Sequence, residues 1–176
     1  MKLEPIPDHL KKGLRLLFIG FNPSVRSAET GHHYANRNNR FWNILYQAGI
    51  TDRKYEPYED RELLEKGIGF TNIVARPSKA AADITKEEYI EGAELLREKL
   101  AHYQPKIACF VGKGVYQQYG KVKQTNWGLQ KSSVTSNVVE FVAPSSSGLV
   151  RMPMADIVHI YAELPAVLKD IEEEIK

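Results

Sequence analysis

Cysteine is almost absent from the sequence, and this limits the covalent chemistry of the chain. Cys109 is the only cysteine among 176 residues, so no disulfide can form within the chain. It lies inside an apolar run, where we expect a small core residue rather than a nucleophile. The lack of disulfides fits a reducing compartment, and we expect a cytosolic, nuclear or organellar protein.

Long hydrophobic runs and a strong net charge are missing too. No apolar stretch approaches the length of a membrane span, and residues 1–12 have no apolar core of a signal peptide, so we expect no membrane association. The formal net charge is only +2, which permits a nucleic-acid partner without arguing for one. With 43% hydrophobic and 26% charged residues, the composition is that of one folded domain over residues 1–176, with its core at about 14–164.

Several short motifs of well-known enzymes are absent. Gly112-Lys113-Gly114 lacks the spacing of a phosphate-binding loop and is typical of a strand-to-helix turn. No Gly-x-Ser-x-Gly elbow accompanies the serines at 145–147, which argues against a serine hydrolase. His32 and His33 are adjacent in an extended loop and so point apart, and no Cys, Asp or Glu lies at ligand spacing. We therefore predict no metal and no other cofactor.

Apolar runs that stop at turn residues predict the core strands. They cover residues 14–19, 69–74, 107–111 and 138–142, with a weak strand inside 121–136. Helical spacing and capping residues predict helices over 38–48, 59–66, 85–102 and 114–119, and a C-terminal helix over 157–171 with a kink or restart at Pro165. Because strands alternate with helices, we expect an α/β fold: a three-layer sandwich whose central, mainly parallel sheet of four or five strands is flanked by helices.

Two loops of unusual composition leave core strands, one after Ile19 and one after Val142. The first, residues 21–38, has no hydrophobic period, and a loop of that length in a small domain is usually functional. If both strands are parallel, both loops lie at the same carboxyl edge and face one crevice. Asn22 stands at the carboxyl end of the first strand, although turn chemistry explains Asn22 and Pro23 equally well.

The side chains of these loops suit a base or a nucleic acid. Amides such as Asn22 and Asn72 read base edges, and Tyr34 can support a stacked base. Hydroxyl and backbone N–H groups at 145–147 can hold phosphates. Packing and turn roles also explain Tyr34 and Asn72, so the residue types alone leave both interpretations open.

The residues that follow the serines have a separate use. After Gly148, Leu149 can act as an apolar wedge and Arg151 as a cation in a duplex groove. The alternative is that Leu149 is a buried anchor of its own loop.

Five ordered motifs resemble the mismatch-specific uracil/thymine DNA glycosylases, family 2 of the uracil-DNA glycosylase superfamily. Gly20-Phe21-Asn22-Pro23-Ser24 is similar to the first family motif, Gly-Ile-Asn-Pro-Gly. The others are Gly31-His32-His33-Tyr34 with Asn39-Arg40-Phe41-Trp42, residues 69–76, residues 103–108, and Pro144-Ser145-Ser146-Ser147 with Gly148-Leu149-Val150-Arg151. The resemblance runs from about Leu14 to Tyr161. His-His-Tyr and the serine triplet resemble the eukaryotic thymine branch, and Gly-Leu-x-Arg the bacterial uracil branch.

The resemblance implies a monofunctional DNA repair enzyme and assigns residues to it. The enzyme flips a mismatched or damaged base opposite guanine out of the duplex and hydrolyses its N-glycosidic bond, leaving an abasic site. Uracil is the first candidate, with thymine and modified bases further candidates. By resemblance, Asn22 is catalytic and positions the attacking water. The base-binding residues would be Gly20, Phe21, Ser27, His33, Tyr34 and Asn72. The DNA-binding residues would be Ser145, Ser146, Ser147, Gly148, Leu149 and Arg151.

The same resemblance sets expectations about partners. The partner would be double-stranded DNA with a G-mismatched base, bound by a monomer without metal or cofactor. A prokaryotic protein would be cytoplasmic and nucleoid-associated, and a eukaryotic one nuclear.

Departures from the family pattern bear on the choice of base. Ser24 and Phe21 replace Gly and Ile in the first motif, which leaves the exact base preference open. Ser27 stands where the family approaches the 5-substituent of the base, and its hydroxyl would seat a methyl group poorly. We therefore expect uracil to be preferred over thymine. The alternative is a non-catalytic nucleic-acid-binding module on the same fold, which would keep Tyr34 but have no need of Asn22.

Overall fold

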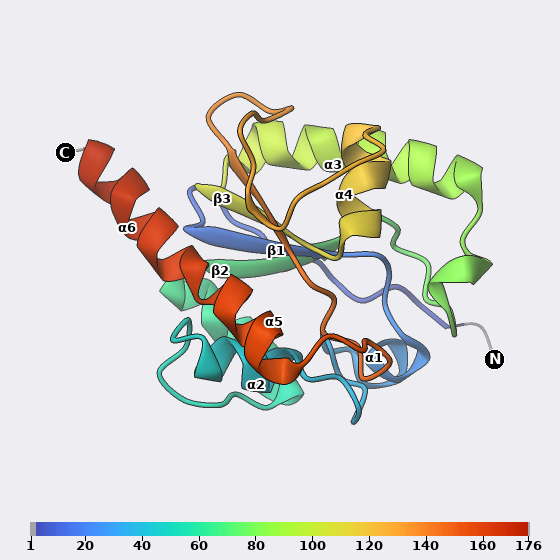
Figure 1. The fold of residues 1–176 in the computed structure, drawn as a ribbon. Helices are drawn as coiled ribbons and strands as arrows, with labels where there is room; N and C mark the ends of the chain where they lie inside the picture. Colours follow the sequence, from blue (N-terminus) through green and yellow to red (C-terminus); the bar gives the residue numbers. More distant parts are fainter. Residues whose placement is uncertain (1–2, 176) are drawn as a thin grey trace.

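The computed structural model describes residues 3–175, so residues 1, 2 and 176 of the expected 1–176 domain lie outside the described residues. Its centre is a five-stranded sheet in the order β2-β1-β3-β5-β4 (Figure 1). The parallel strands are β1 (Leu16–Gly20), β2 (Ile68–Asn72), β3 (Ile107–Val111) and β5 (Val139–Ala143). The short β4 (Gly128–Leu129) pairs antiparallel with β5. The predicted α/β class with a mainly parallel sheet is confirmed.

Both faces of the sheet are covered, which is why its strands are continuous apolar runs rather than alternating ones. All five residues of β1 are buried. Its side chains alternate between the two faces, so Leu16 and Phe18 join one hydrophobic cluster and Leu17 and Ile19 the other.

Helices form the two outer layers, as predicted (Figure 1). The face that carries Phe18 is covered by α2 (Phe41–Gln47), the 3₁₀ segment η1 (Pro57–Lys66), α5 (Met154–Tyr161) and α6 (Glu163–Ile175). The opposite face is covered by α3 (Lys86–Tyr103) and α4 (Lys113–Gly120). A short 3₁₀ turn, η2 (Ala81–Asp83), leads into α3. No helix within residues 3–175 is long and apolar enough to cross a membrane.

The predicted capping box at Thr85 is confirmed, whereas the helix predicted over 38–48 begins only at Phe41, after an N-cap residue, Arg40, that makes no side-chain cap bond. At the start of α3, Thr85 accepts a hydrogen bond from the Glu88 backbone, and the Glu88 side chain accepts one from the Thr85 backbone, as the predicted capping box requires. The C-terminal helix does restart, at Glu163, with Pro165 in the first turn of α6. A proline is tolerated there because the N–H groups of a first turn have no partner within the helix.

The segment at 21–38 also differs from the sequence-based expectation. Residues 21–38 are not a loop throughout, because α1 (Val25–Thr30) forms within them. Ser24 caps this helix by accepting from the Ser27 backbone N–H, and Gly31 ends it with a left-handed φ of 79°. Ser27 is the only residue of α1 that is buried, so the helix has no hydrophobic period by which it could be recognised.

Candidate active site

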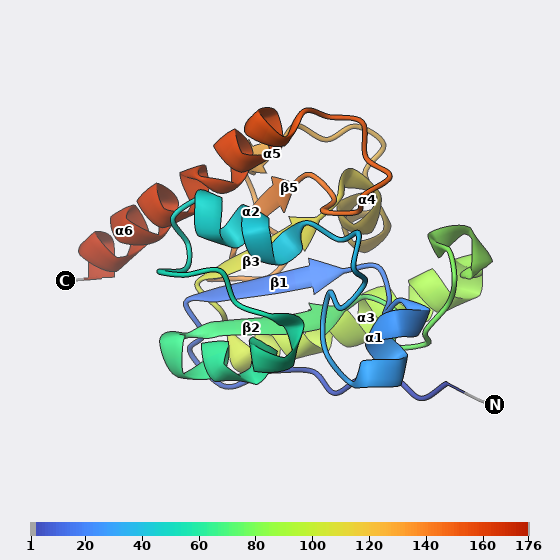
Figure 2. The same cartoon turned by 90° about the horizontal axis from the view of Figure 1, so that it is seen from below.

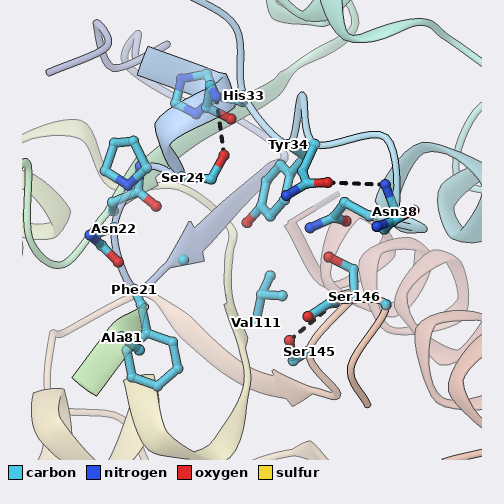
Figure 3. Close-up of a pocket in the computed structure, with 18 of the residues that line it drawn as sticks. Phe21, Asn22, Ser24, His33, Tyr34, Asn38, Ala81, Val111, Ser145 and Ser146 are labelled. Atoms are coloured by element: carbon cyan, nitrogen blue, oxygen red, sulfur yellow. Dashed lines mark hydrogen bonds between the residues drawn. The ribbon is translucent and has the colours of Figure 1, made fainter. Parts of the chain in front are cut away.

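The carboxyl ends of the parallel strands open into one large cavity, of about 840 Å³. Figure 2 shows β1 and β2 pointing toward α1, and Figure 3 shows the cavity from close by. It is lined by Gly20 at the end of β1 and residues 21–24 after it, Ser27 of α1, Asn72 of β2, Val111 of β3, and segments of 33–40, 78–81 and 145–149. The loops after Ile19 and Val142 therefore do face the same crevice.

The amide of Asn22 is held in one orientation. Its Nδ2 donates to the Arg76 carbonyl oxygen and to Ser78 Oγ, both at 2.8 Å. Because a carbonyl oxygen only accepts, the NH₂ group must be the one that faces Arg76. Both amide hydrogens are then used, and Oδ1 remains as a hydrogen-bond acceptor at the cavity wall. Ser78 Oγ in turn donates to the Ala80 carbonyl at 2.8 Å.

Tyr34 provides a flat aromatic surface in the cavity. Its ring stacks on Phe41 with centroids 3.8 Å apart and an interplanar angle of 9°. The residue is partly exposed and lines the cavity. Its backbone adopts a left-handed φ of 52°, a conformation that costs a non-glycine residue about 1–3 kcal/mol and is often found at functional sites.

The Tyr34 hydroxyl lies close to Asn72 and Gly20. It is buried and has no hydrogen-bond partner among the described residues. Burial raises the pKa of this hydroxyl, so it stays protonated. A Cβ atom at Gly20 would lie 2.7 Å from Asn72 Oδ1 and 3.1 Å from the Tyr34 hydroxyl oxygen. A side chain at position 20 would therefore crowd both polar groups, and glycine avoids this.

Ser27 and His33 fix the segment around Tyr34 through hydrogen bonds. Ser27 is 2% exposed, and its Oγ accepts from the Ala35 backbone N–H at 3.1 Å. His33 Nε2 contacts the Pro7 carbonyl at 2.9 Å, and its backbone N–H donates to Asp60 Oδ2 at 2.8 Å. The pKa of His33 is lowered to about 4, mainly by burial and to a smaller extent by the neighbouring His9. The imidazole is therefore neutral at neutral pH.

Phe21 contributes to the cavity wall, but its ring packs elsewhere. It meets Tyr89 at a centroid distance of 6.2 Å and lies against Gly114, whose Cβ, if present, would come within 2.6 Å of Phe21 Cζ. Figure 3 shows the ring directed away from Tyr34. The replacement of Ile by Phe in the first motif is therefore accommodated toward α3 and α4.

The loop that carries the serines is anchored to the segment before α2. Arg40 donates from its backbone N–H to the Ser146 carbonyl at 2.9 Å, and from Nη2 to the carbonyls of Ser147 and Val150 at 3.0 and 3.3 Å. Gly148 lies so near Asn38 that a Cβ would come within 2.6 Å of the Asn38 carbonyl oxygen. This support holds a loop whose tip projects into solvent.

The residues of this loop differ in accessibility. Leu149 is 93% exposed, so it is not a buried loop anchor. Arg151 is exposed and lies outside the cavity lining. Ser145 Oγ and Ser147 Oγ accept backbone N–H groups within the loop, and Ser146 is buried against the cavity wall. Ser146 thus has the least access to a phosphate outside the cavity.

Sequence reasoning gave no role to three residues that organise this site: Ser78, Arg40 and Asp60. The Arg40 side chain binds a carbonyl 110 residues further along the chain. The Asp60 side chain binds His33 and His32, which precede it by 27 and 28 residues. The only sequence signal for Ser78 is its position after Pro77, outside the motif at 69–76.

This α/β fold is shared with known proteins. The chain matches the model of the Uracil DNA glycosylase superfamily over residues 7–170, nearly its whole length, and it belongs to that superfamily. A solution NMR structure of a candidate uracil DNA glycosylase from Methanosarcina acetivorans is also similar. The two share 22% identity over 98% of this chain and 99% of that chain, with a TM-score of 0.63, which bears on the fold alone. Superfamily membership implies a hydrolase of the DNA glycosylase type, acting in DNA repair.

Proposed function

We propose that the protein is a mismatch-specific uracil/thymine DNA glycosylase. It would take uracil opposite guanine out of duplex DNA and hydrolyse its N-glycosidic bond, leaving an abasic site. The observation that carries this proposal is the fixed amide of Asn22, a residue of the cavity lining: its two N–H groups are bonded to Arg76 and Ser78, and its Oδ1 has no hydrogen-bond donor within residues 3–175. A non-catalytic binding module on the same fold has no need of such an arrangement.

Asn22 orients a water molecule rather than removing a proton from it. An amide is far too weak a base to accept a proton at neutral pH, but Oδ1 can accept a hydrogen bond from water and hold it for attack. The reaction must then rely on stabilising the departing base and the oxocarbenium-like sugar. We expect slow turnover for this reason.

The cavity suits an extruded base. A base in the stack cannot be reached by water at its glycosidic carbon, so it must rotate out of the duplex. The Tyr34 ring would offer a stacking surface at the cavity, supported from the other side by Phe41. The Asn72 amide and the buried Tyr34 hydroxyl, which both lie beside Gly20, would offer polar groups to the edge of the base.

The duplex would be held open by the loop at 145–151. Leu149 is almost fully exposed at the rim, while Arg40 and Asn38 hold the base of its loop. An apolar side chain inserted into the stack fills the space that the extruded base leaves. Arg151 adds a positive charge two residues after Leu149. We therefore propose duplex DNA as the partner. We also propose that a monomer binds it.

The test is base release by an Asn22→Ala variant, measured under single-turnover conditions on labelled G·U duplex. The rate should fall by more than about a hundredfold, the usual cost of losing a positioned polar group, while affinity for the duplex stays within a few fold. Asn126→Ala, at an exposed site away from the cavity lining, is the matched control and should retain activity. Unchanged cleavage by Asn22→Ala would exclude the water-positioning role.

A further inference from the structure

A second cluster of chemistry-bearing side chains lies behind the Tyr34 segment. His9 comes from the N-terminal lead-in, His33 from the segment before Tyr34, and Asp60 from η1. They are 3%, 2% and 1% exposed. One ring nitrogen of each histidine and one carboxylate oxygen lie within 4.8 Å of one another. We call this group the His9–His33–Asp60 cluster. The Asn22 side chain is hydrogen-bonded to Arg76 and Ser78 and not to any member of this cluster.

The hydrogen bonds leave nitrogen lone pairs in this cluster. Because the Pro7 carbonyl only accepts, His33 Nε2 carries the proton, and Nδ1 of the neutral ring holds the lone pair. Histidines that ligate metals commonly donate their other nitrogen to a backbone carbonyl in this way. His9 Nδ1 is buried and has no hydrogen-bond partner among residues 3–175. Such an orphaned buried nitrogen needs an explanation.

The charges in the cluster are also unbalanced. Desolvation by burial is the largest cause that lowers the pKa of both histidines. Asp60 is almost fully buried, and its one ion-pair partner among the described residues is His32, whose Nδ1 lies 3.1 Å from Asp60 Oδ1. No lysine or arginine of that part of the chain lies within ion-pair distance of this carboxylate.

We propose that the His9–His33–Asp60 cluster binds a divalent transition metal of the zinc class. Two imidazoles and one carboxylate are a donor set that Zn²⁺ accepts. His32 could add a further ligand, because its Nδ1 lies 3.1 Å from Asp60 Oδ1 and its side chain is 34% exposed. Sequence spacing argued against a metal because both His9 and Asp60 are distant from His33 along the chain.

The geometry sets a condition on this site. Ligands about 2.0–2.2 Å from a tetrahedral zinc lie roughly 3.3 Å from one another. The cluster spans up to 4.8 Å, so binding would draw ligand atoms together by up to roughly 1.5 Å. Side-chain rotation can supply this without disturbing the backbone pairing of His9 with Phe70.

The metal would have a structural role. It would join the N-terminal lead-in, η1 and the segment that carries Tyr34, which otherwise meet through hydrogen bonds and ring contacts. A ligand that binds the folded chain but not the unfolded chain raises the melting temperature. The proposed hydrolysis needs no metal. The metal-binding proposal and the proposed glycosylase function can therefore be tested independently.

The experiment measures metal binding directly. Purified full-length protein is dialysed against EDTA and then titrated with ZnCl₂ against a chromophoric zinc indicator, and with CoCl₂ by visible absorption. We expect one tight Zn²⁺ per chain, Co²⁺ bands of a tetrahedral site, and a rise in melting temperature with Zn²⁺. His9→Gln and Asp60→Asn should each weaken Zn²⁺ binding by more than about tenfold. His102→Gln, at an exposed helix end, is the matched control and should bind as the unmodified protein does.

The controls distinguish a loss of metal binding from misfolding of a variant and from a loss of base release. Circular dichroism must show that the variants fold, and two different substitutions guard against the failure of one. Absence of tight binding to the unmodified protein would overturn the proposal, and so would equal binding by His9→Gln, Asp60→Asn and His102→Gln. Base release on G·U duplex, measured in EDTA, tests the proposed function independently of these results.

Discussion

Ser78→Ala tests whether the orientation of the Asn22 amide, and not merely its presence, supports catalysis. The substitution removes one of the two acceptors of Asn22 Nδ2 and leaves the other, the Arg76 carbonyl, in place. It also removes the bond from Ser78 Oγ to the Ala80 carbonyl, which shapes the same turn. The amide should therefore keep its preferred orientation but hold it less firmly.

The expected magnitude follows from one lost hydrogen bond. Asn22 is only partly buried, so water can satisfy the released N–H group. A typical hydrogen bond contributes about 0.5–1.5 kcal/mol net. If that energy goes into positioning Oδ1, single-turnover base release on G·U duplex should slow by roughly 2- to 12-fold. Duplex affinity should not change, because Ser78 is not proposed to touch the bound strand.

The decisive assay is a double-mutant cycle with Asn22→Ala. Once the Asn22 side chain is gone, removing the Ser78 hydroxyl should have no further effect on the rate, since Ser78 acts through that amide. Ser78→Thr retains a hydroxyl and should stay close to the unmodified rate. An equal loss from Ser78→Ala in both backgrounds would refute the positioning role and indicate general damage to the turn.

Two further predictions concern the duplex and the choice of base. Leu149→Ala with Arg151→Ala should reduce activity on G·U duplex more than on single-stranded uracil, because both residues would act on the duplex; equal losses on both substrates would indicate a structural role for the loop. The unmodified protein should prefer G·U over G·T, with the Ser27 hydroxyl supplying about 1–3 kcal/mol, or one to two decades in rate. Ser27→Ala should lower the rates on both duplexes, because the Ala35 N–H loses its acceptor, but it should also reduce the ratio of the G·U rate to the G·T rate. Similar rates on G·T and G·U duplexes in the unmodified protein would contradict this reasoning.

The core strands, though not their order in the sheet, could be predicted from the sequence because the determinants of each strand are local. Continuous apolar runs imply strands buried on both faces, and the reciprocal bonds of Thr85 and Glu88 mark the start of α3 within the chain itself. A parallel sheet then requires that the loops after Ile19 and Val142 share one edge, which is the edge that bears the cavity.

The supporting residues could not be predicted because their effects depend on tertiary contacts. Arg40 holds carbonyls more than 100 residues away, and Asp60 holds the backbone of His33 across 27 residues. Neither spacing belongs to a helix or strand period. α1 escaped prediction for a related reason, since a helix with a single buried residue leaves no apolar pattern to detect.

The proposed chemistry depends on the register of β1 against β2. These strands pair Leu16 with Ile68 through Gly20 with Asn72, and the pairing continues past the strands through Ile73 N–H to the Gly20 carbonyl and Val74 N–H to the Phe21 carbonyl. That continuation brings the segment with Arg76 and Ser78 beside Asn22. A shift of one residue would send the side chains of a strand to the opposite faces of the sheet and would separate Asn22 from its partners. The apolar residues that fix this register therefore also fix the distance between the amide proposed to hold water and the amide proposed to hold the base.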